Sequence, residues 1–304
     1  MIPPHYSESP AAGERVASRC ICCGSSGLSR SPAILMPFVA HRVFGWQPVT
    51  IDHTWGLNTI QSGTAYALCN SVLCQDCGLL FLDMRFSDNE LRSLYDGYKD
   101  DDYTELREKY EPGYRQRYAL MAGAGGVKSY LHKVEEFLAP LLSSPPRILD
   151  WGGDTGSNSP FRNHNKLLHV YDISRKEPAA GATAVDIETA RQTDYDLIVC
   201  SQVLEHVSFP AETLREIRRS MRQDTLLYIE VPYEEILRTS VGDRNVHTRK
   251  RHWHEHVNFF TEESLRRLLS RCGLDIVSSH LLLLPDAPPN GSHLFQVACK
   301  ANSP

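Results

Sequence analysis

The sequence predicts an α/β protein in which a small cysteine-rich module precedes a doubly wound, mostly parallel sheet. From residue 147 onward, strand-like and helix-like segments alternate over about 150 residues, which is typical of such a sheet. Six of the nine cysteines lie before residue 78, as in a metal-binding module. The chain has 304 residues, 41% of them hydrophobic and 23% charged, which is an ordinary globular composition.

Composition and charge exclude several classes of protein. The net charge of −5 disfavours nucleic acid as the main partner, because a phosphate-binding surface usually makes a domain basic. The unbroken apolar runs are far shorter than the roughly 20 residues that cross a bilayer, and the opening MIPPHYSESP is unlike a secretory signal. We therefore expect a cytoplasmic protein with a small-molecule partner and no membrane span.

Two CxxC pairs dominate the cysteine-rich module, which we place at residues 19–86. Cys20 and Cys23 form the first pair and Cys74 and Cys77 the second, and a glycine follows each. A glycine lets the chain turn tightly, so that backbone amides face the thiolates. Four thiolates suit a closed, structural zinc site with no open position for catalysis. The alternative is a metal-free cluster of reduced thiols.

The segments around this module have their own signals. Residues 1–18 are expected to be a loose tail, and strands are predicted at 65–69 and 79–82. Residues 87–143 predict a helical linker or lid, with a first helix near Asn89 capped by Ser87 or Asp88 and an amphipathic helix over 127–142. The lid is rich in tyrosines, which usually serve packing, and Tyr98 or Tyr114 is expected to close over a cofactor.

The main domain is predicted over residues 144–304, with an acceptor-binding insertion at 232–260. Helices are expected at 211–222 and 261–272, the second beginning at a Thr261 cap and ending at Gly273. The predicted strands are 147–151, 167–173, 183–187, 195–201, 225–231, 274–281 and 293–299.

A glycine-rich turn follows the first of these strands. Gly152 and Gly156 mark a strand-to-helix turn, where open α/β sheets bind ligands, and Asp172 lies 22 residues after Asp150. An acidic residue at that position can accept hydrogen bonds from ribose hydroxyls. NAD, FAD and S-adenosylmethionine sites all share such a turn, so the turn alone leaves the cofactor open.

Two motifs narrow the choice. DWGGDTG (150–156) and YDLIVCSQVLEHV (195–207) resemble the first and fourth motifs of class I S-adenosylmethionine-dependent methyltransferases, and the resemblance covers 147–300. It implies a Rossmann-like seven-stranded fold ending in an antiparallel hairpin, whereas a Rossmann oxidoreductase is the alternative. Asp154 replaces the family's middle glycine and either contacts the cofactor's ammonium group or caps a following helix. The implied cofactor-binding residues are Asp150, Gly152, Gly153, Asp154, Gly156, Asp172, Ile173, Asp186, Ile187, Ser201, Gln202 and Tyr98.

The insertion carries the candidate catalytic groups. A neutral imidazole can take the acceptor's proton near pH 7, and a carboxylate beside it can orient it. We expect His256 to be the general base, aided by Glu255 and His254. Arg249, Arg251 and Tyr233 are the expected substrate-binding residues, because guanidinium groups can clamp an anionic substrate. Alternatively, His252, His254 and His256 form a strand face that binds a second metal, or the histidines are structural.

The arrangement also resembles the bacterial sugar C-methyltransferases that act on dTDP-linked keto-deoxysugars. The four-cysteine zinc module, GWQP (45–48), CGLLFL (77–82) and the His254-Glu255-His256 stretch carry this resemblance. It implies a nucleotide-linked sugar as acceptor, with Glu255 and His256 in proton transfer. Two departures are Trp253 in place of a tyrosine and the lack of that family's C-terminal domain. A non-catalytic scaffold, or a methyltransferase that docks RNA or protein through the zinc module, is the alternative function.

Overall fold

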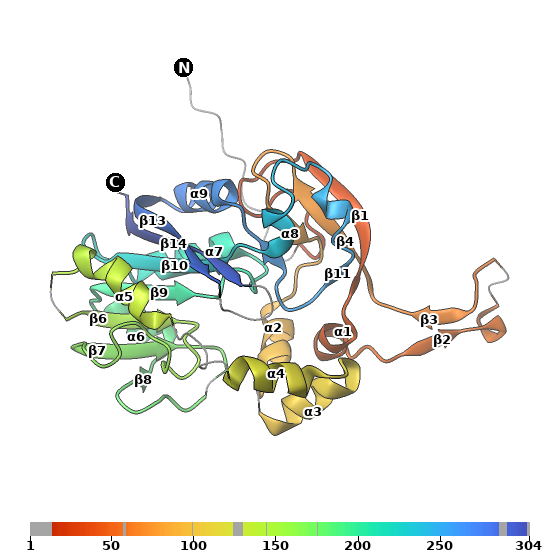
Figure 1. Ribbon diagram of the computed structural model, residues 1–304, viewed down its shortest axis with the longest axis horizontal. Coiled ribbons are helices and arrows are strands. Elements are labelled where there is room, and N and C mark those ends of the chain that lie inside the picture. The colour runs from red at the N-terminus through yellow and green to blue at the C-terminus, as the bar shows by residue number, and fades with distance from the viewer. Residues whose placement is uncertain are drawn as a thin grey trace, which may run out of the picture.

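A computed structural model describes residues 14–56, 59–98, 100–123, 130–143, 145–174, 176–285 and 291–302. Its larger sheet has seven strands in the order β13-β14-β10-β9-β6-β7-β8 (Figure 1). β14 runs antiparallel to both of its neighbours, while β10, β9, β6, β7 and β8 are parallel. The expected seven-stranded sheet with a final hairpin is therefore present. Its strands are β6 (Arg147–Trp151), β7 (Leu167–Tyr171), β8 (Thr183–Ala184), β9 (Leu197–Ser201), β10 (Leu226–Pro232), β13 (Leu274–Leu284) and β14 (Ser292–Ala301).

Helices cover both faces of this sheet because its central strands are apolar on both sides. On β9, Leu197 and Val199 pack in the core that α5 (Leu131–Leu138) completes, whereas Ile198 and Cys200 face α7 (Pro210–Arg219) and α9 (Glu262–Arg271). Buried strands with apolar residues at successive positions are typical of parallel sheets. Among the helices of the described residues, none is long and apolar enough to cross a membrane.

A second sheet of five strands combines the N-terminal module with the acceptor insertion. Its order is β11-β1-β4-β5-β12. In the register, His252 pairs with Ile34 and Asn258 pairs with Phe81. The insertion therefore forms both edges of this sheet. Its central strands come from the N-terminal module: one follows the first CxxC pair, one ends at Cys74 and one follows Cys77. The five strands are β1 (Leu28–Leu35), β4 (Leu68–Cys74), β5 (Leu80–Leu82), β11 (His252–Trp253) and β12 (Asn258–Phe259).

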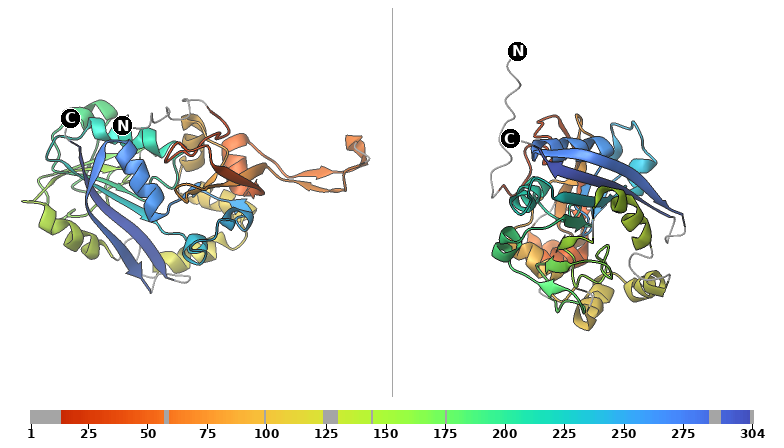
Figure 2. Two further views of the ribbon diagram at one scale, coloured as in Figure 1. Left: turned by 90° about the horizontal axis from the view of Figure 1, so that it is seen from above. Right: turned by 90° about the vertical axis from the view of Figure 1, so that its left-hand side faces the viewer.

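The lid segment packs against the face of this second sheet. Leu94 and Tyr103 of the lid share a buried core with Phe38 of the N-terminal module and with Trp253 and Phe259 of the insertion. A two-stranded hairpin, β2 (Val49–Ile51) and β3 (Gly63–Ala65), extends away from the body of the protein (Figures 1 and 2). The helices of this region are α1 (Pro37–Phe44), α2 (Asp88–Tyr95), α3 (Asp101–Tyr110) and α4 (Tyr114–Gly123), and shorter ones elsewhere are α6 (Ile187–Gln192), α8 (Glu235–Arg238), η1 (His53–Trp55), η2 (Ala139–Leu141) and η3 (Val246–Thr248).

The caps predicted from the sequence are confirmed. Ser87 caps α2, and Glu90 returns a hydrogen bond to it. Thr261 caps α9 with Ser264 as its reciprocal partner, and Gly273 follows the helix with φ +70°. Each cap satisfies backbone N–H groups that the first turn leaves without partners.

Several element predictions are wrong in detail. The segment between β6 and β7 contains no helix, because its sequence, GGDTGSNSPFRNHN, is rich in residues that favour turns. β8 ends at Ala184 rather than at residue 187, since the Asp186 carboxylate accepts from Thr189 N and starts α6. The strand expected at 65–69 is divided between β3 and β4.

The ends of the N-terminal region and of the lid differ as well. Residues 14–18 are not loose: Val16 forms a bridge with Met84, and Ala17 is buried; residues 1–13 of the expected tail lie outside the described residues. Of the helix expected at 127–142, α5 occupies 131–138 and η2 follows it, while 127–129 lie outside the described residues.

Candidate active site and cysteine cluster

The glycine-rich loop after β6 requires glycine at the predicted positions. Gly152 and Gly156 have φ of +76° and +75°. A Cβ on Gly152 would lie 2.6 Å from Val203 Cγ2, and one on Gly156 would lie 2.7 Å from Val170 Cγ2. Both glycines thus combine a left-handed backbone with a close approach, which side chains do not tolerate. Gly153 is equally restricted, since its Cβ would meet the buried carboxylate of Asp150.

Asp154 takes the backbone conformation of the glycine that it replaces. Its φ is +54°, and aspartate is among the few residues that enter this region readily. No helix follows it, so the expectation that it caps one is wrong. Its carboxylate lies 3.0 Å from Lys176 Nζ, and the same ammonium lies over the Tyr98 ring at 5.4 Å. Lys176 therefore links the loop to the lid, and sequence reasoning missed it.

Asp172 and Asp186, which were predicted to contact the ribose and the adenine, both accept hydrogen bonds from backbone amides nearby. Asp172 accepts from Asp154 N at 2.8 Å and from Ser174 N at 2.7 Å, so it fixes the glycine-rich loop. Asp186 is exposed and caps α6, whose first residue is Ile187. Ile173 is 46% exposed after β7. An exposed apolar side chain at this end of the strands is available to a ligand.

At the end of β9, a buried glutamate organises the neighbouring polar groups. Glu230 on β10 accepts from Ser201 Oγ at 2.7 Å and from Gln202 Nε2 at 3.2 Å. Tyr130 and Tyr228 donate to the same carboxylate, at 2.8 Å and 2.7 Å. Gln202 has φ +60°. These bonds orient the two residues that were expected to line the methyl-facing end of the pocket.

His256 pairs with Glu234, not with its sequence neighbour Glu255. Its Nδ1 lies 2.7 Å from Glu234 Oε1, and its side chain is 38% exposed. Burial by itself lowers the pKa of an imidazole, but the hydrogen bond to Glu234 outweighs it and raises the pKa of His256 to about 9. Burial raises the pKa of Glu234, and the hydrogen bond with His256 brings it below its usual value.

Next to His256 stand Glu205 and His206, which follow β9. The ring centroids of His206 and His256 are 4.6 Å apart. Glu205 is completely buried, and burial raises its pKa to about 7. One ligand-type atom from each of the three residues lies within 4.8 Å of the others. The LEHV text lies in the predicted fourth motif, but its pairing with His256 could not be read from the sequence.

A buried polar clamp brings these distant segments together. Asn258 donates from Nδ2 to Leu204 O at 2.8 Å and to Val207 O at 2.7 Å. Its Oδ1 accepts from Arg85 Nη1 at 3.1 Å, and Arg85 also donates to Ser208 O at 2.8 Å. Burial lowers the pKa of Arg85 to about 10. The clamp therefore joins the N-terminal module, the insertion and the loop after β9.

The other two predicted catalytic residues are engaged with the lid. Tyr103 donates to Glu255 Oε1 at 2.5 Å, and Arg107 Nη1 lies 3.0 Å from Glu255 Oε2. His254 Nε2 lies 2.5 Å from Glu111. Burial raises the pKa of Glu255, but the hydrogen bond from His254 and the charge of Arg107 bring it well below its ordinary range. Glu255 and His254 thus anchor α3 to the insertion.

The remaining predicted residues lie apart from this network. Arg249 and Arg251 have exposed side chains, the first bonded to Ser240 Oγ. Tyr233 is half-buried and packs on Phe295 at 4.6 Å between ring centroids. Within the described residues, only two side-chain groups have the geometry to hold a metal, and the set of histidines at 252, 254 and 256 is not one of them. That alternative for the three histidines is therefore wrong.

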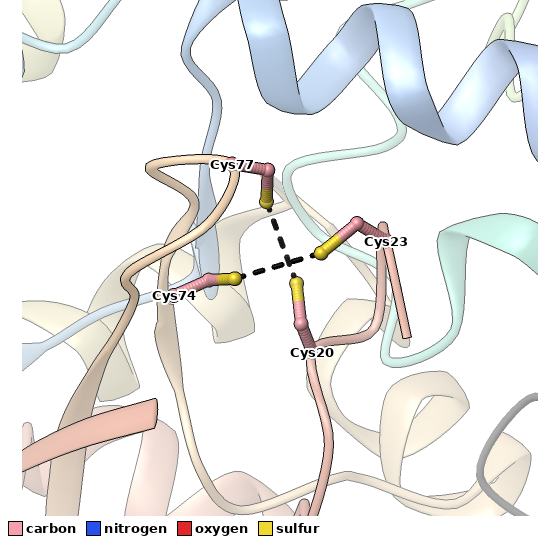
Figure 3. Close-up of side chains that lie close together, drawn as sticks. All are labelled: Cys20, Cys23, Cys74 and Cys77. Carbon is pink, nitrogen blue, oxygen red and sulfur yellow. Dashed lines mark hydrogen bonds between the residues drawn. The ribbon is translucent and has the colours of Figure 1, made fainter. Parts of the chain in front are cut away.

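The four predicted zinc ligands converge on one point (Figure 3). The Cys20 and Cys77 sulfurs are 3.6 Å apart, and those of Cys23 and Cys74 are 3.5 Å apart. Four sulfurs at about 2.3 Å from a zinc ion would stand roughly 3.8 Å from one another, so the residues fit a tetrahedral ion. The site is mostly buried.

The cysteine cluster rests against α9 of the main domain. Thr261 Oγ1, at the start of that helix, donates to Cys77 O at 2.9 Å, and Arg271 donates to Cys22 O. Contacts of this kind fix the cluster to the seven-stranded sheet.

The strand order and the glycine-rich loop define a Rossmann-like α/β domain with a ligand site at the carboxyl ends of its strands. Residues 119–279 match the family described as "Methyltransferase domain". This match spans more than half of the chain, and the chain belongs to that family. It is a methyltransferase.

Solved structures with a similar fold include three methyltransferases. One is a putative methyltransferase of Bacillus halodurans, with 12% identity and a TM-score of 0.42, covering 58% of this chain and 100% of that chain. Another is the 1,6-didemethyltoxoflavin N1-methyltransferase of Burkholderia thailandensis with bound 1,6-didemethyltoxoflavin and S-adenosylhomocysteine, with 16% identity and a TM-score of 0.47, covering 75% of this chain and 97% of that chain. The third is an S-adenosylmethionine-dependent methyltransferase of Methanosarcina mazei, with 15% identity and a TM-score of 0.40, covering 55% of this chain and 98% of that chain. No curated protein matches the sequence significantly.

Proposed function

We propose that this enzyme transfers the methyl group of S-adenosylmethionine to a small polar acceptor, a nucleotide-linked sugar or a related polysaccharide or natural-product intermediate. The observation that carries the proposal is the joining of the acceptor insertion to the loop after β9: Val257 N donates to Glu205 O at 2.7 Å, which places His256 beside the end of that strand. The bound sulfonium would supply an activated methyl group, so the protein has to align the acceptor and remove its proton.

The cofactor would lie on the glycine-rich loop. Gly152, Gly153 and Gly156 let the loop pack closely against Val203, Asp150 and Val170, and this closely packed backbone is the proposed seat of the methionine portion. Asp154 is the proposed partner of the ammonium group, Asp172 and Ile173 of the ribose, and Asp186 and Ile187 of the adenine. Ser201, Gln202 and Tyr98 would enclose the methyl-facing end, the first two held by Glu230.

His256 is the proposed proton-transfer group for the acceptor. Its Nδ1 is held by Glu234, so Nε2 would take the acceptor's proton, and it would do so in the neutral form of a ring whose pKa is raised to about 9. Glu255 and His254 would be positioning residues, since their contacts tie the insertion to α3. Arg249, Arg251 and Tyr233 are proposed to hold the acceptor, with the exposed guanidinium groups on a diphosphate.

A structural zinc ion is proposed to be bound by the thiolates of Cys20, Cys23, Cys74 and Cys77. Cytoplasmic location is proposed as well, because none of the nine cysteines forms a disulfide in the structure and reduced cysteines persist in reducing compartments. The domain limits in the proposal stay at 19–86, 87–143 and 144–304.

Calorimetry with S-adenosylmethionine and S-adenosylhomocysteine tests the cofactor site, and mass spectrometry of products from a panel of nucleotide-linked sugars tests the acceptor. His256→Ala should keep cofactor binding and lower turnover about 10² to 10⁴-fold. His252→Ala, at an exposed position of the same insertion, should leave both cofactor binding and turnover unchanged. Absence of cofactor binding at millimolar concentration would reject the cofactor site. Methylation of RNA or protein alone would reject the small acceptor.

A further inference from the structure

Glu205 is a buried charge-bearing group that the methyl-transfer proposal does not use. Its exposed fraction is 0%, and neither carboxylate oxygen has a hydrogen-bond partner among the described residues. An ionisable group buried without a partner is costly, so such an arrangement indicates a missing cationic partner. The side chain of His206 approaches this carboxylate through Nε2, which lies 3.9 Å from Glu205 Oε1.

The two histidines beside Glu205 are oriented as metal ligands are. His256 Nδ1 donates to the Glu234 carboxylate at 2.7 Å. His206 Nδ1 lies 3.2 Å from Glu255 O, a carbonyl that can only accept, and 2.7 Å from the Tyr95 hydroxyl. Both rings thus use Nδ1 for these outer partners, and His206 turns its Nε2 toward Glu205, 3.9 Å from Oε1. A carboxylate or carbonyl on the far nitrogen is the usual outer partner of a metal-binding histidine.

We propose that Glu205, His206 and His256 bind one divalent transition-metal ion at the acceptor end of the active site. Their ligand atoms lie within 4.8 Å of one another, whereas ligands around an ion at about 2.1 Å stand roughly 3 to 3.5 Å apart. Small rotations of His206 and His256, which are 21% and 38% exposed, would close the set. Two imidazoles and one carboxylate suit Mn²⁺, Fe²⁺, Co²⁺ or Zn²⁺ better than Ca²⁺.

Three protein ligands leave open positions on the ion for water or an acceptor. The inference rests on the proposed function and deepens it: the acceptor presents an oxygen to the ion, and His256 acts in deprotonation through the ion that it holds. The hydroxyl proton leaves to water, the oxygen forms a bond to the methyl carbon, and the S–CH₃ bond breaks with its electron pair on sulfur. The products are a methyl ether and S-adenosylhomocysteine.

Mn²⁺ titration followed by electron paramagnetic resonance tests the site without any assay of turnover. Mn²⁺ prefers oxygen and nitrogen donors over thiolates, so it separates this site from the cysteine cluster. We expect one Mn²⁺ per chain, at least about 100-fold weaker binding in Glu205→Gln and His206→Gln, and a loss of about 10 to 100-fold in Glu234→Gln. His252→Gln is the matched control and should bind as the wild type does.

Circular dichroism and S-adenosylhomocysteine calorimetry show whether each variant is folded. Absence of Mn²⁺ binding to wild type, or equal binding by a folded Glu205→Gln variant, overturns the inference. Mn²⁺ binding without any cofactor binding would reject the proposed function and leave the ion site standing. Turnover that survives removal of metal with EDTA rejects the role of the ion and returns proton transfer to the free His256 imidazole.

Discussion

Replacing Asn258 by alanine tests whether the buried clamp holds the acceptor side of the site in place. The change removes two hydrogen bonds to the carbonyls of Leu204 and Val207 and one from Arg85. At about 1 kcal/mol for each bond, the free energy of unfolding should fall by about 3 kcal/mol. Because Asn258 is completely buried, water cannot replace the lost partners without opening the loop after β9.

Urea unfolding followed by tryptophan fluorescence measures this change, provided that the denaturant slope stays constant. Asn302→Ala is the matched control: Asn302 is exposed and accepts one hydrogen bond from Arg218, so its cost should stay below about 0.5 kcal/mol. Asn258→Ala should also lower turnover by about 10²-fold, since a displacement of about 1 Å can have that effect. Equal stability of the two variants, or full turnover in a destabilised Asn258→Ala, would refute the reasoning.

Three further predictions concern the glycine-rich loop, the cysteine cluster and the lid. Gly156→Ala should lower the free energy of unfolding by about 2 to 4 kcal/mol and weaken cofactor binding, because the new Cβ would meet Val170. Gly181 has a similar φ but open space around it, so Gly181→Ala is the control and should lower the free energy of unfolding by only about 1 to 2 kcal/mol in thermal melts. Cys77→Ser should lose the proposed zinc in elemental analysis, whereas a Cys69→Ser variant that also loses zinc would contradict the proposed ligands. Arg107→Met removes the guanidinium that lies 3.0 Å from the partly buried Glu255 carboxylate and should cost about 3 kcal/mol in urea unfolding; an unchanged midpoint would show that the ion pair does not hold α3.

Local sequence determines a large part of this protein. Apolar runs bounded by turn residues locate the central strands, because a strand buried on both faces must be apolar at successive positions. Cys20 and Cys74 were predicted to act with the cysteines three residues later, since that spacing brings two thiols to one turn. The restriction to glycine at positions 152 and 156 also follows from the motif.

Only the tertiary structure decided which side chains meet at the acceptor end. His256 was expected to act with its neighbour Glu255, but successive residues of an extended segment point to opposite sides. Its observed partner is Glu234, 22 residues earlier. The pairing of β11 and β12 with strands of the N-terminal module places His256 beside Glu205, and Asn258 locks that arrangement. Contacts between segments so far apart depend on packing of the whole chain, which local pattern does not encode.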